Sequence, residues 1–152
     1  MSDYKEYIVR VYYDRTQWRN KEGQLHREDG PAVEWSDGTK SWYQYEKRHR
    51  EDGPAVEYAN GDKCWYKNGL QHREDGPAVE WASGDKYWYQ NGKLHREDGP
   101  AIECANRHKA WYINGKQLTE QEFNNRNKKE FSMDEIAAAL GVPVGELKIK
   151  KD

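Results

Sequence analysis

His72-Arg73-Glu74-Asp75-Gly76-Pro77-Ala78 is one of four copies of a heptapeptide, and the other copies begin at His26, His49 and His95. Successive copies are 23 residues apart. Self-similarity at a fixed period is typical of repeat proteins, in which each repeat is one supersecondary unit. A Trp-Tyr pair follows every copy in the same register, at Trp42-Tyr43, Trp65-Tyr66, Trp88-Tyr89 and Trp111-Tyr112. The sequence therefore predicts four tandem copies of one local structure.

Within one unit, two turn signals separate short strand-like segments. The segment 31–36 begins with proline, which is tolerated at the first position of a strand. Asp37-Gly38 is a strong signal for a two-residue hairpin turn, so 39–44 is the returning strand. A second turn follows the Trp-Tyr pair at Asn68-Gly69, Asn91-Gly92 and Asn114-Gly115, with Tyr45-Glu46 in its place in the first unit. Because a 23-residue unit is too short for two parallel strands and a crossover helix, the sheet must be antiparallel.

A two-residue turn at Asp37-Gly38 places residue 33 opposite residue 42 and residue 35 opposite residue 40. Val33, Trp35, Lys40 and Trp42 then share one face, and residue 41 lies on the other face. We interpret the tryptophan face as the core; the alternative is that part of it stays open as a binding trough. The tryptophans of this stripe are Trp35, Trp42, Trp65, Trp81, Trp88 and Trp111. Position 41 is the variable one, occupied in the four units by Ser41, Cys64, Tyr87 and Ala110.

The composition fits a thin fold that is stabilised by aromatic side chains. The chain of 152 residues has 7 Trp and 11 Tyr but only 2 Phe, and a net charge of −2. Basic and acidic residues are mixed along it, without the basic excess that general phosphate-backbone binding needs. It contains no apolar run near the length of a membrane span and no signal-peptide pattern. We therefore expect a soluble, cytoplasmic protein with free thiols at Cys64 and Cys104.

The segments that flank the repeats differ from them and are expected to close the sheet. Residues 1–25 read as an N-terminal capping strand and a decayed half-repeat, residues 26–117 as the four repeats, and residues 118–152 as a C-terminal cap. In the cap, Thr119 with Glu122 and Ser132 with Glu135 are capping boxes that predict two short helices, the second at 133–140. Residues 147–150 alternate like a strand. The predicted fold is thus mainly β: a single curved antiparallel sheet of tandem hairpins with a short α/β cap.

The repeat also resembles a known family. Asn91-Gly92-Lys93-Leu94-His95, followed by a glycine turn and an aromatic pair at period 23, is similar to a MORN-type repeat, which is also a hairpin of this length. His-Arg-Glu-Asp-Gly-Pro-Ala replaces the family's usual His-Gly-x-Gly, and Trp-Tyr replaces Gly-x-Trp. This form is similar to repeats in uncharacterised proteins of large bacteriophages and giant viruses. The resemblance covers about residues 19–117, and it implies binding and assembly rather than a particular chemistry.

The repeated histidines and acids do not predict an enzyme or a metal site. Equivalent residues of successive two-strand units are expected ~10 Å apart. A metal ion needs its ligands within roughly 2–2.6 Å, so His26, His49, His72 and His95 cannot share one ion. No phosphate loop or nucleophile motif is present in the sequence. We expect no catalytic residue, no metal and no cofactor.

The expected function is therefore non-enzymatic binding of a protein partner. The candidate partner-binding residues are those where the units differ or cluster aromatic rings: Tyr66, Tyr87, Tyr89, Arg48, Arg107 and His108. The viral resemblance suggests a phage-encoded inhibitor of a bacterial defence protein, such as an anti-CRISPR, acting in the host cytoplasm. One alternative is a nucleic-acid or nucleotide binder that stacks bases on Trp and Tyr and contacts phosphates through Lys40, Lys63, Lys86 and Lys109. The other is a structural, self-assembling repeat protein.

Overall fold

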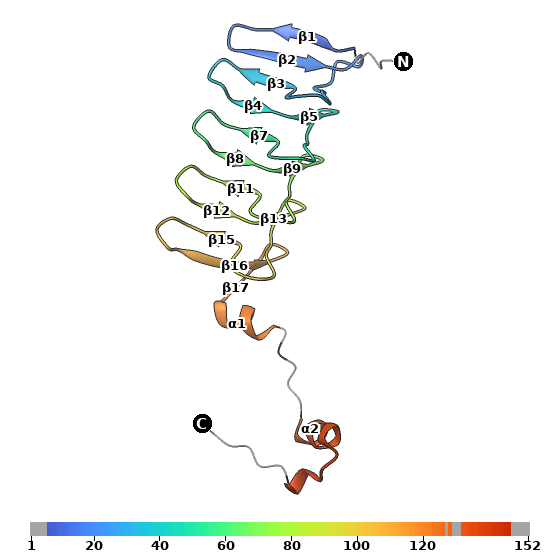
Figure 1. Cartoon of the computed structure of the whole chain (residues 1–152), viewed down its shortest axis with the longest axis vertical. Coiled ribbons are helices and arrows are strands. Elements are labelled where there is room, and N and C mark those ends of the chain that lie inside the picture. The colour runs from blue at the N-terminus through green and yellow to red at the C-terminus, as the bar shows by residue number, and fades with distance from the viewer. Residues whose placement is uncertain (1–5, 127, 129–131, 147–152) are drawn as a thin grey trace. The chain divides into compact units, whose positions relative to one another are not determined.

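The computed structural model describes residues 6–126, 128 and 132–146. The chain divides into two compact units, Met1–Glu120 and Gln121–Asp152. The predicted fold class is confirmed: the protein is mainly β, with one large open antiparallel sheet and two α-helices (Figure 1). In the part of the chain that the structure describes, no helix combines the length and the apolar character needed to cross a membrane.

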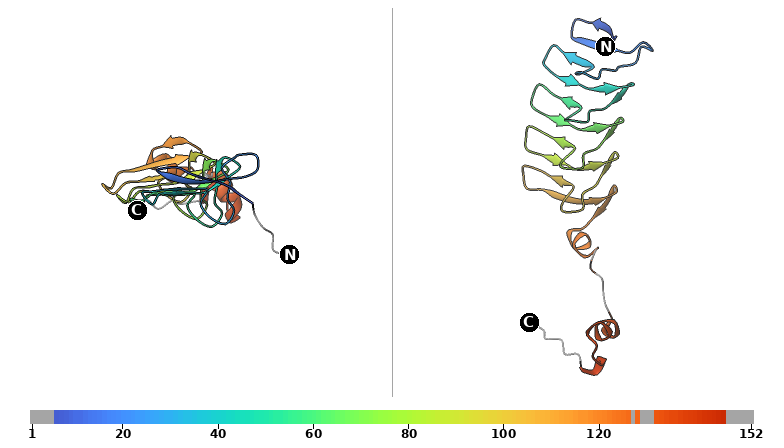
Figure 2. Two further views of the ribbon diagram at one scale, coloured as in Figure 1. Left: turned by 90° about the horizontal axis from the view of Figure 1, so that it is seen from above. Right: turned by 45° about the vertical axis from the view of Figure 1, so that its right-hand side comes forward.

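The main sheet contains 11 strands, and consecutive hairpins stack side by side along it. Its strands, in spatial order, are β1 (Ile8–Val11), β2 (Arg15–Arg19), β3 (Val33–Trp35), β4 (Lys40–Ser41), β7 (Val56–Glu57), β8 (Lys63–Cys64), β11 (Val79–Glu80), β12 (Lys86–Tyr87), β15 (Ile102–Glu103), β16 (Lys109–Ile113) and β17 (Lys116–Leu118). The tips of these long hairpins form one row in Figures 1 and 2. Each 23-residue unit contributes one such hairpin, as its two turn signals predict.

A second row of short hairpins forms the other side of the stack (Figure 2). They are β5 (Tyr43–Gln44) with β6 (Lys47–Arg48), β9 (Tyr66–Lys67) with β10 (Leu70–Gln71), and β13 (Tyr89–Gln90) with β14 (Lys93–Leu94). Both turn residues have positive φ, for example 51° at Asn68 and 85° at Gly69, which explains the recurring Asn-Gly. The amide of Gly69 donates to the carbonyl oxygen of Arg48 at 2.9 Å, and this bond recurs in later units. The short hairpins are thus linked into a row of their own.

The predicted pairing within the long hairpin is wrong by one residue. Val33 lies opposite Ser41 and Glu34 opposite Lys40, because the turn contains three residues, 36–38. The amide of Trp35 donates to the carbonyl oxygen of Thr39 at 2.9 Å. Gly38 has a positive φ of +94°, whereas the φ of Asp37 is not positive. This is a turn that ends in a left-handed glycine, not a two-residue turn. A slip of one residue moves every side chain of the returning strand to the other face.

The corrected register defines two faces of the sheet. The first, which we call the valine face, carries Val33, Trp35 and Ser41, and their equivalents in the other units. Its core is the cluster of Val56, Cys64 and Val79, against which Tyr66, Tyr87 and Tyr89 pack. The opposite, lysine face carries Glu34, Lys40 and Trp42, and the fully buried alanines of the heptapeptide. Trp35 and Trp42 therefore lie on opposite faces. Position 41, which varies among the units, lies on the valine face with the core.

The second unit is helical where it is described. Helix α1 (Glu120–Asn125) begins after Thr119, and α2 (Met133–Leu140) is followed by the short 3-10 helix η1 (Val144–Glu146). The capping box predicted for α2 is confirmed, since the Glu135 amide donates to Ser132 Oγ and Ser132 N–H donates to the Glu135 carboxylate. Gly141 ends α2 with a φ of 68°. The strand predicted at 147–150 lies outside the described residues.

Candidate functional site

The arginine of the heptapeptide stacks on a tryptophan of the preceding unit. The Arg50 guanidinium lies 4.0 Å from the ring centre of Trp42, and the same stack forms between Arg73 and Trp65 and between Arg96 and Trp88. Arg50 also donates to the carbonyl oxygen of Pro54, and it forms ion pairs with Asp52 at 2.8 Å and with Glu57 at 2.9 Å. The recurring Arg, Asp and Pro of the heptapeptide thus have a structural role in joining neighbouring units.

The histidine of the heptapeptide supports the short hairpin that follows it. Nδ1 of His49 accepts the backbone N–H of Asn68 at 3.1 Å, and His72 and His95 accept the N–H of Asn91 and Asn114 in the same way. An Nδ1 atom that accepts a hydrogen bond leaves Nε2 as the donor of the ring. Nε2 of His49 lies 2.8 Å from the Glu51 carboxylate. The histidines are therefore already engaged within the fold.

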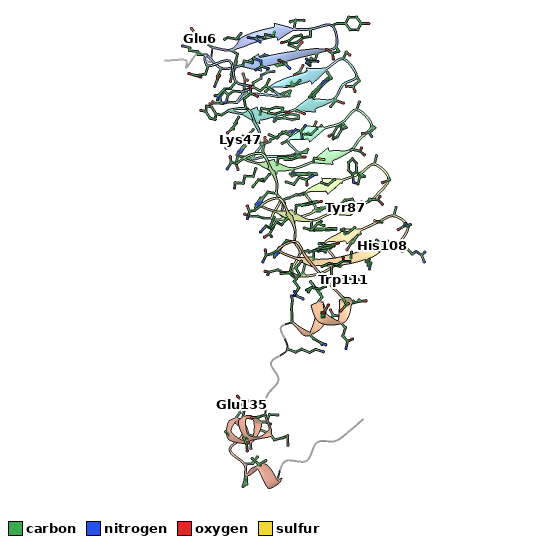
Figure 3. The ribbon with its side chains drawn as sticks, turned by 180° about the vertical axis from the view of Figure 1, so that it is seen from behind. Glu6, Lys47, Tyr87, His108, Trp111 and Glu135 are labelled. Atoms are coloured by element: carbon green, nitrogen blue, oxygen red, sulfur yellow. The ribbon has the colours of Figure 1, made fainter. Side chains whose placement is uncertain are left out.

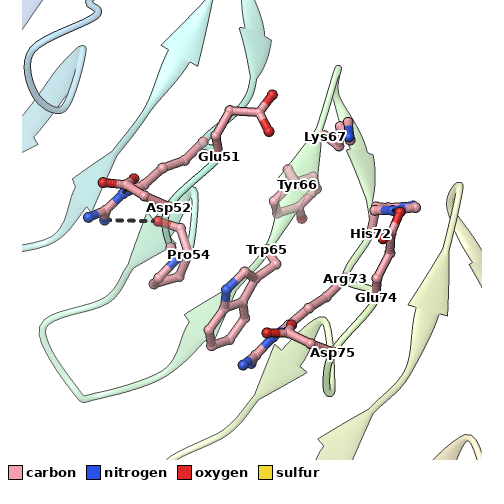
Figure 4. A pocket seen from close by; sticks show the side chains of 12 residues that line it. Glu51, Asp52, Pro54, Trp65, Tyr66, Lys67, His72, Arg73, Glu74 and Asp75 are labelled. Carbon is pink, nitrogen blue, oxygen red and sulfur yellow. Dashed lines mark hydrogen bonds and ion pairs between the residues drawn. The ribbon is translucent and has the colours of Figure 1, made fainter.

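Two hollows lie between successive heptapeptide loops on the lysine face. The first, of about 680 Å³, is lined by the loops 50–54 and 72–75 and by Trp65; Figure 4 shows this ring between the two loops. The second repeats it one unit later, with Trp88 and a volume of about 770 Å³. Hydrogen bonds from the arginines lower the pKa of Asp52, Asp75 and Asp98, so these rim carboxylates stay ionised. The rims of both hollows therefore carry ionised aspartates that are paired with arginines.

Four aromatic side chains follow one another along the valine face, near the tips of the hairpins. Tyr12, Trp35, Tyr58 and Trp81 occupy equivalent places in successive hairpins, and we call them the aromatic strip. Tyr58 is 38% exposed and Trp81 39% exposed, although the neighbouring Val56 and Val79 are buried. Sequence reasoning placed Trp35, Tyr58 and Trp81 at equivalent positions on one face but missed Tyr12 as a member of this row. The one-residue difference in register had placed the lysines on the same face as this row, whereas in the structure they lie on the opposite face.

The structure brings four of the six predicted partner-binding residues together. Tyr66, Tyr87 and Tyr89 pack against the core of the valine face, and Arg48 lies 5.3 Å from the ring centre of Tyr66. Burial raises the pKa of Tyr87 and of Tyr89, so both phenols are protonated at neutral pH. These tyrosines are half-buried and support the floor beside the aromatic strip.

Arg107 and His108 lie apart from that cluster. Both are exposed, and they belong to the turn of the last long hairpin, where Arg107 adopts a φ of 71° in place of the usual glycine. Figure 3 shows His108 at the row of tips and Lys47 in the row of short hairpins on the other side. The predicted cluster therefore divides into a core group and a tip group.

The four repeated lysines alternate with glutamates on the lysine face. Lys63 lies opposite Glu57 on one neighbouring strand and opposite Glu80 on the other, and Lys86 lies between Glu80 and Glu103. Lys40 and Lys109 have glutamates opposite them in the same way. The row of charges alternates in sign and lies on the face opposite the aromatic strip.

The comparisons with protein-family models and with curated proteins give no match to this sequence. Among the described residues, no group of three or more His, Cys, Asp or Glu side chains is arranged to hold a metal ion. The two cysteines are free, and burial raises the pKa of the Cys64 thiol to about 11. The arrangement thus offers surfaces for contact, and its repeated polar groups are engaged with one another.

Proposed function

We propose that this chain is a non-enzymatic, MORN-like repeat module that binds a protein partner on the valine face. The observation that carries the proposal is the aromatic strip, in which Tyr58 and Trp81 keep more than a third of their surface exposed above a buried floor. Aromatic anchors beside a packed floor are the usual hot spots of protein interfaces. Tyr12, with Arg15 4.7 Å from its ring centre, extends the strip to the first hairpin.

The distribution of charge favours a protein over a nucleic acid as partner. A nucleic-acid surface combines stacking rings with cations that follow the phosphate backbone. Here the strip and the four lysines lie on opposite faces, and each lysine has a glutamate opposite it. The tryptophans that share the lysine face, Trp42, Trp65 and Trp88, are stacked on arginines. We expect no gel shift of single-stranded nucleic acid at physiological salt.

The proposed site is tested by capturing the partner and then measuring its affinity for variants of this chain. The wild-type chain is used to capture proteins from a bacterial lysate, and the purified partner is then titrated by calorimetry against Tyr58→Ser, Trp81→Ser and the control Tyr13→Ser. Tyr13 is fully exposed at the β1–β2 turn, outside the strip. Loss of a hot-spot ring weakens binding about tenfold or more, or ~1.4 kcal/mol. Equal affinities for all three variants would disprove the proposed site.

The narrower expectation of a phage-encoded inhibitor of a bacterial defence system, for example an anti-CRISPR, rests on the resemblance of the repeats to viral proteins. The same capture experiment tests it, because the partner would then be a component of such a system. A partner of another kind would overturn the narrower proposal and leave the binding site itself open to the calorimetric test.

A further inference from the structure

Strand β1 is the terminal strand of the main sheet, and its outer edge pairs with no other strand among the described residues. Its apolar side chains are exposed: Ile8 by 44%, Val9 by 51% and Val11 by 77%. Edge strands are usually protected by lysine, proline, a bulge or short length. The strand β17, at the other end, carries Lys116, whereas β1 has an unbroken register with β2, no proline and no lysine, and one charged side chain, Arg10. An exposed, regular apolar edge is a template for pairing with another strand.

The hydrogen bonds of β1 determine which groups are available at this edge. The amide of Tyr12 donates to the carbonyl oxygen of Arg15 at 2.7 Å, so the even-numbered residues of β1 bond to β2. Trp18, which lies opposite Val9 on β2, agrees with this alternation, because its amide donates to the carbonyl oxygen of Ala32 in the next hairpin and not to β1. Antiparallel strands alternate the direction of their backbone groups. The N–H and C=O groups of Val9 and Val11 therefore point away from the sheet.

We propose that a second copy of this chain pairs with this edge, β1 against β1 in antiparallel orientation, with Val9 opposite Val9 of the partner copy. This register pairs the whole segment 6–12 with itself. Tyr7 faces Val11, an aromatic–β-branched pair, and Ile8 faces Arg10. Glu6 is diagonal to Arg10, within reach of two long side chains, and it already forms an exposed ion pair with Lys21. A register shifted by one pair would place Arg10 opposite Arg10, which is unfavourable.

The pairing of two copies does not depend on the binding function proposed above. The two-fold axis of antiparallel edge pairing runs through the sheet, so both valine faces lie on the same side. Ile8, Arg10 and Tyr12 share the valine face, as the pairing of Arg10 with Gln17 and of Gln17 with Val33 shows. The two aromatic strips would lie on the same side of the joined sheet. They would not be continuous, because the hairpin tips of the two copies point in opposite directions, which separates the two Tyr12 side chains by six residues along the strand, about 20 Å. Such a dimer would present two copies of the site to one partner or to two.

Sedimentation equilibrium of the full chain across micromolar concentrations tests the pairing. We expect a concentration-dependent dimer for the wild type and a monomer for Val9→Pro. Proline at position 9 removes an outward N–H and no bond to β2, so circular dichroism and the melting temperature should change little. The matched control, Val9→Thr, keeps the N–H and the β-branched shape and should remain a dimer. A wild type that is monomeric throughout, or a Val9→Pro variant that still dimerises, overturns the proposal.

Cross-linking tests the register independently of the stability of the proline variant. Directly opposed residues that bond to each other have Cα atoms ~5.5 Å apart, within the range that a disulfide spans. Val9→Cys in a Cys104→Ser background should therefore form a covalent dimer under mild oxidation. Val11→Cys places the two thiols four residues apart along the strand, about 13 Å, and should not. A faster reaction of Val11→Cys than of Val9→Cys would contradict the register.

Discussion

Replacing Arg73 by alanine tests whether the arginine–tryptophan stack holds consecutive units together. The Arg73 guanidinium lies 4.2 Å from the ring centre of Trp65. Nη1 donates to the Pro77 carbonyl oxygen at 3.3 Å and pairs with Glu80 at 3.0 Å, while Nε pairs with Asp75 at 2.8 Å. One side chain thus joins a strand, a loop and a ring, and alanine removes all of these contacts.

The cost can be worked out from these contacts. A half-buried guanidinium on an indole stabilises by about 1 kcal/mol. The bond to the Pro77 carbonyl contributes about 1 kcal/mol. Glu80 is 35% exposed, so solvent screening reduces its pair with Arg73 to roughly 0.5 kcal/mol. Asp75 is 84% exposed and adds little. We expect Arg73→Ala to lower the free energy of unfolding by about 2–3 kcal/mol.

Urea unfolding followed by tryptophan fluorescence measures the loss. Arg73→Lys keeps the charge but not the planar fork, so it should recover less than half of the loss. Arg10→Ala is the control, because this exposed arginine should change the free energy of unfolding by less than about 0.5 kcal/mol. If Arg73→Ala costs no more than Arg10→Ala, or if lysine restores full stability, the structural role assigned to the stack is wrong.

Three further predictions follow from burial and charge. Val79→Ala should lower the free energy of unfolding by about 2 kcal/mol in urea titration, because Val79 is 2% exposed and two methyl groups leave the core. Asp75→Asn should lower the melting temperature only slightly at pH 7, and the difference from the wild type should disappear in acid: the arginine bond lowers the folded-state pKa of Asp75, so the stabilisation is present above the ordinary aspartate range and lost as the pH falls through the lowered value. Cys64 is 4% exposed and its pKa is raised to about 11, so in a Cys104→Ser variant it should react with a thiol reagent at pH 8 only on unfolding, which an absorbance assay of the reaction detects.

The period, the hairpins and the second helix could be predicted from the sequence because short-range interactions determine them. The Asn-Gly pairs predict the turns of the short hairpins, and both positions adopt positive φ there. Ser132 and Glu135 predict the start of α2, and Gly141 predicts its end, because all the capping bonds lie within a few residues. The antiparallel sheet follows from the length of the unit alone.

The register could not be derived in the same way. Asp37-Gly38 fits a two-residue turn as well as a three-residue turn that ends in a left-handed glycine, and only the conformation at Asp37 separates the two. That single residue decides whether position 87 faces the core. The same one-residue difference placed the lysines on the face of Trp35, Tyr58 and Trp81, and only the structure separates the two sets.

The sequence by itself determined that one unit is built four times, with two strands and two turns in each. Only the tertiary structure determined what the invariant residues contact. His49 accepts an amide from Asn68 in the next hairpin, and Arg50 stacks on Trp42 of the previous one. These contacts join residues of neighbouring units, so they exist only after the hairpins have stacked. The repeated sequence shows that these residues recur in every unit. Which residues they contact depends on which face of the sheet each side chain lies on. Packing of the valine face against its tyrosines fixes that orientation.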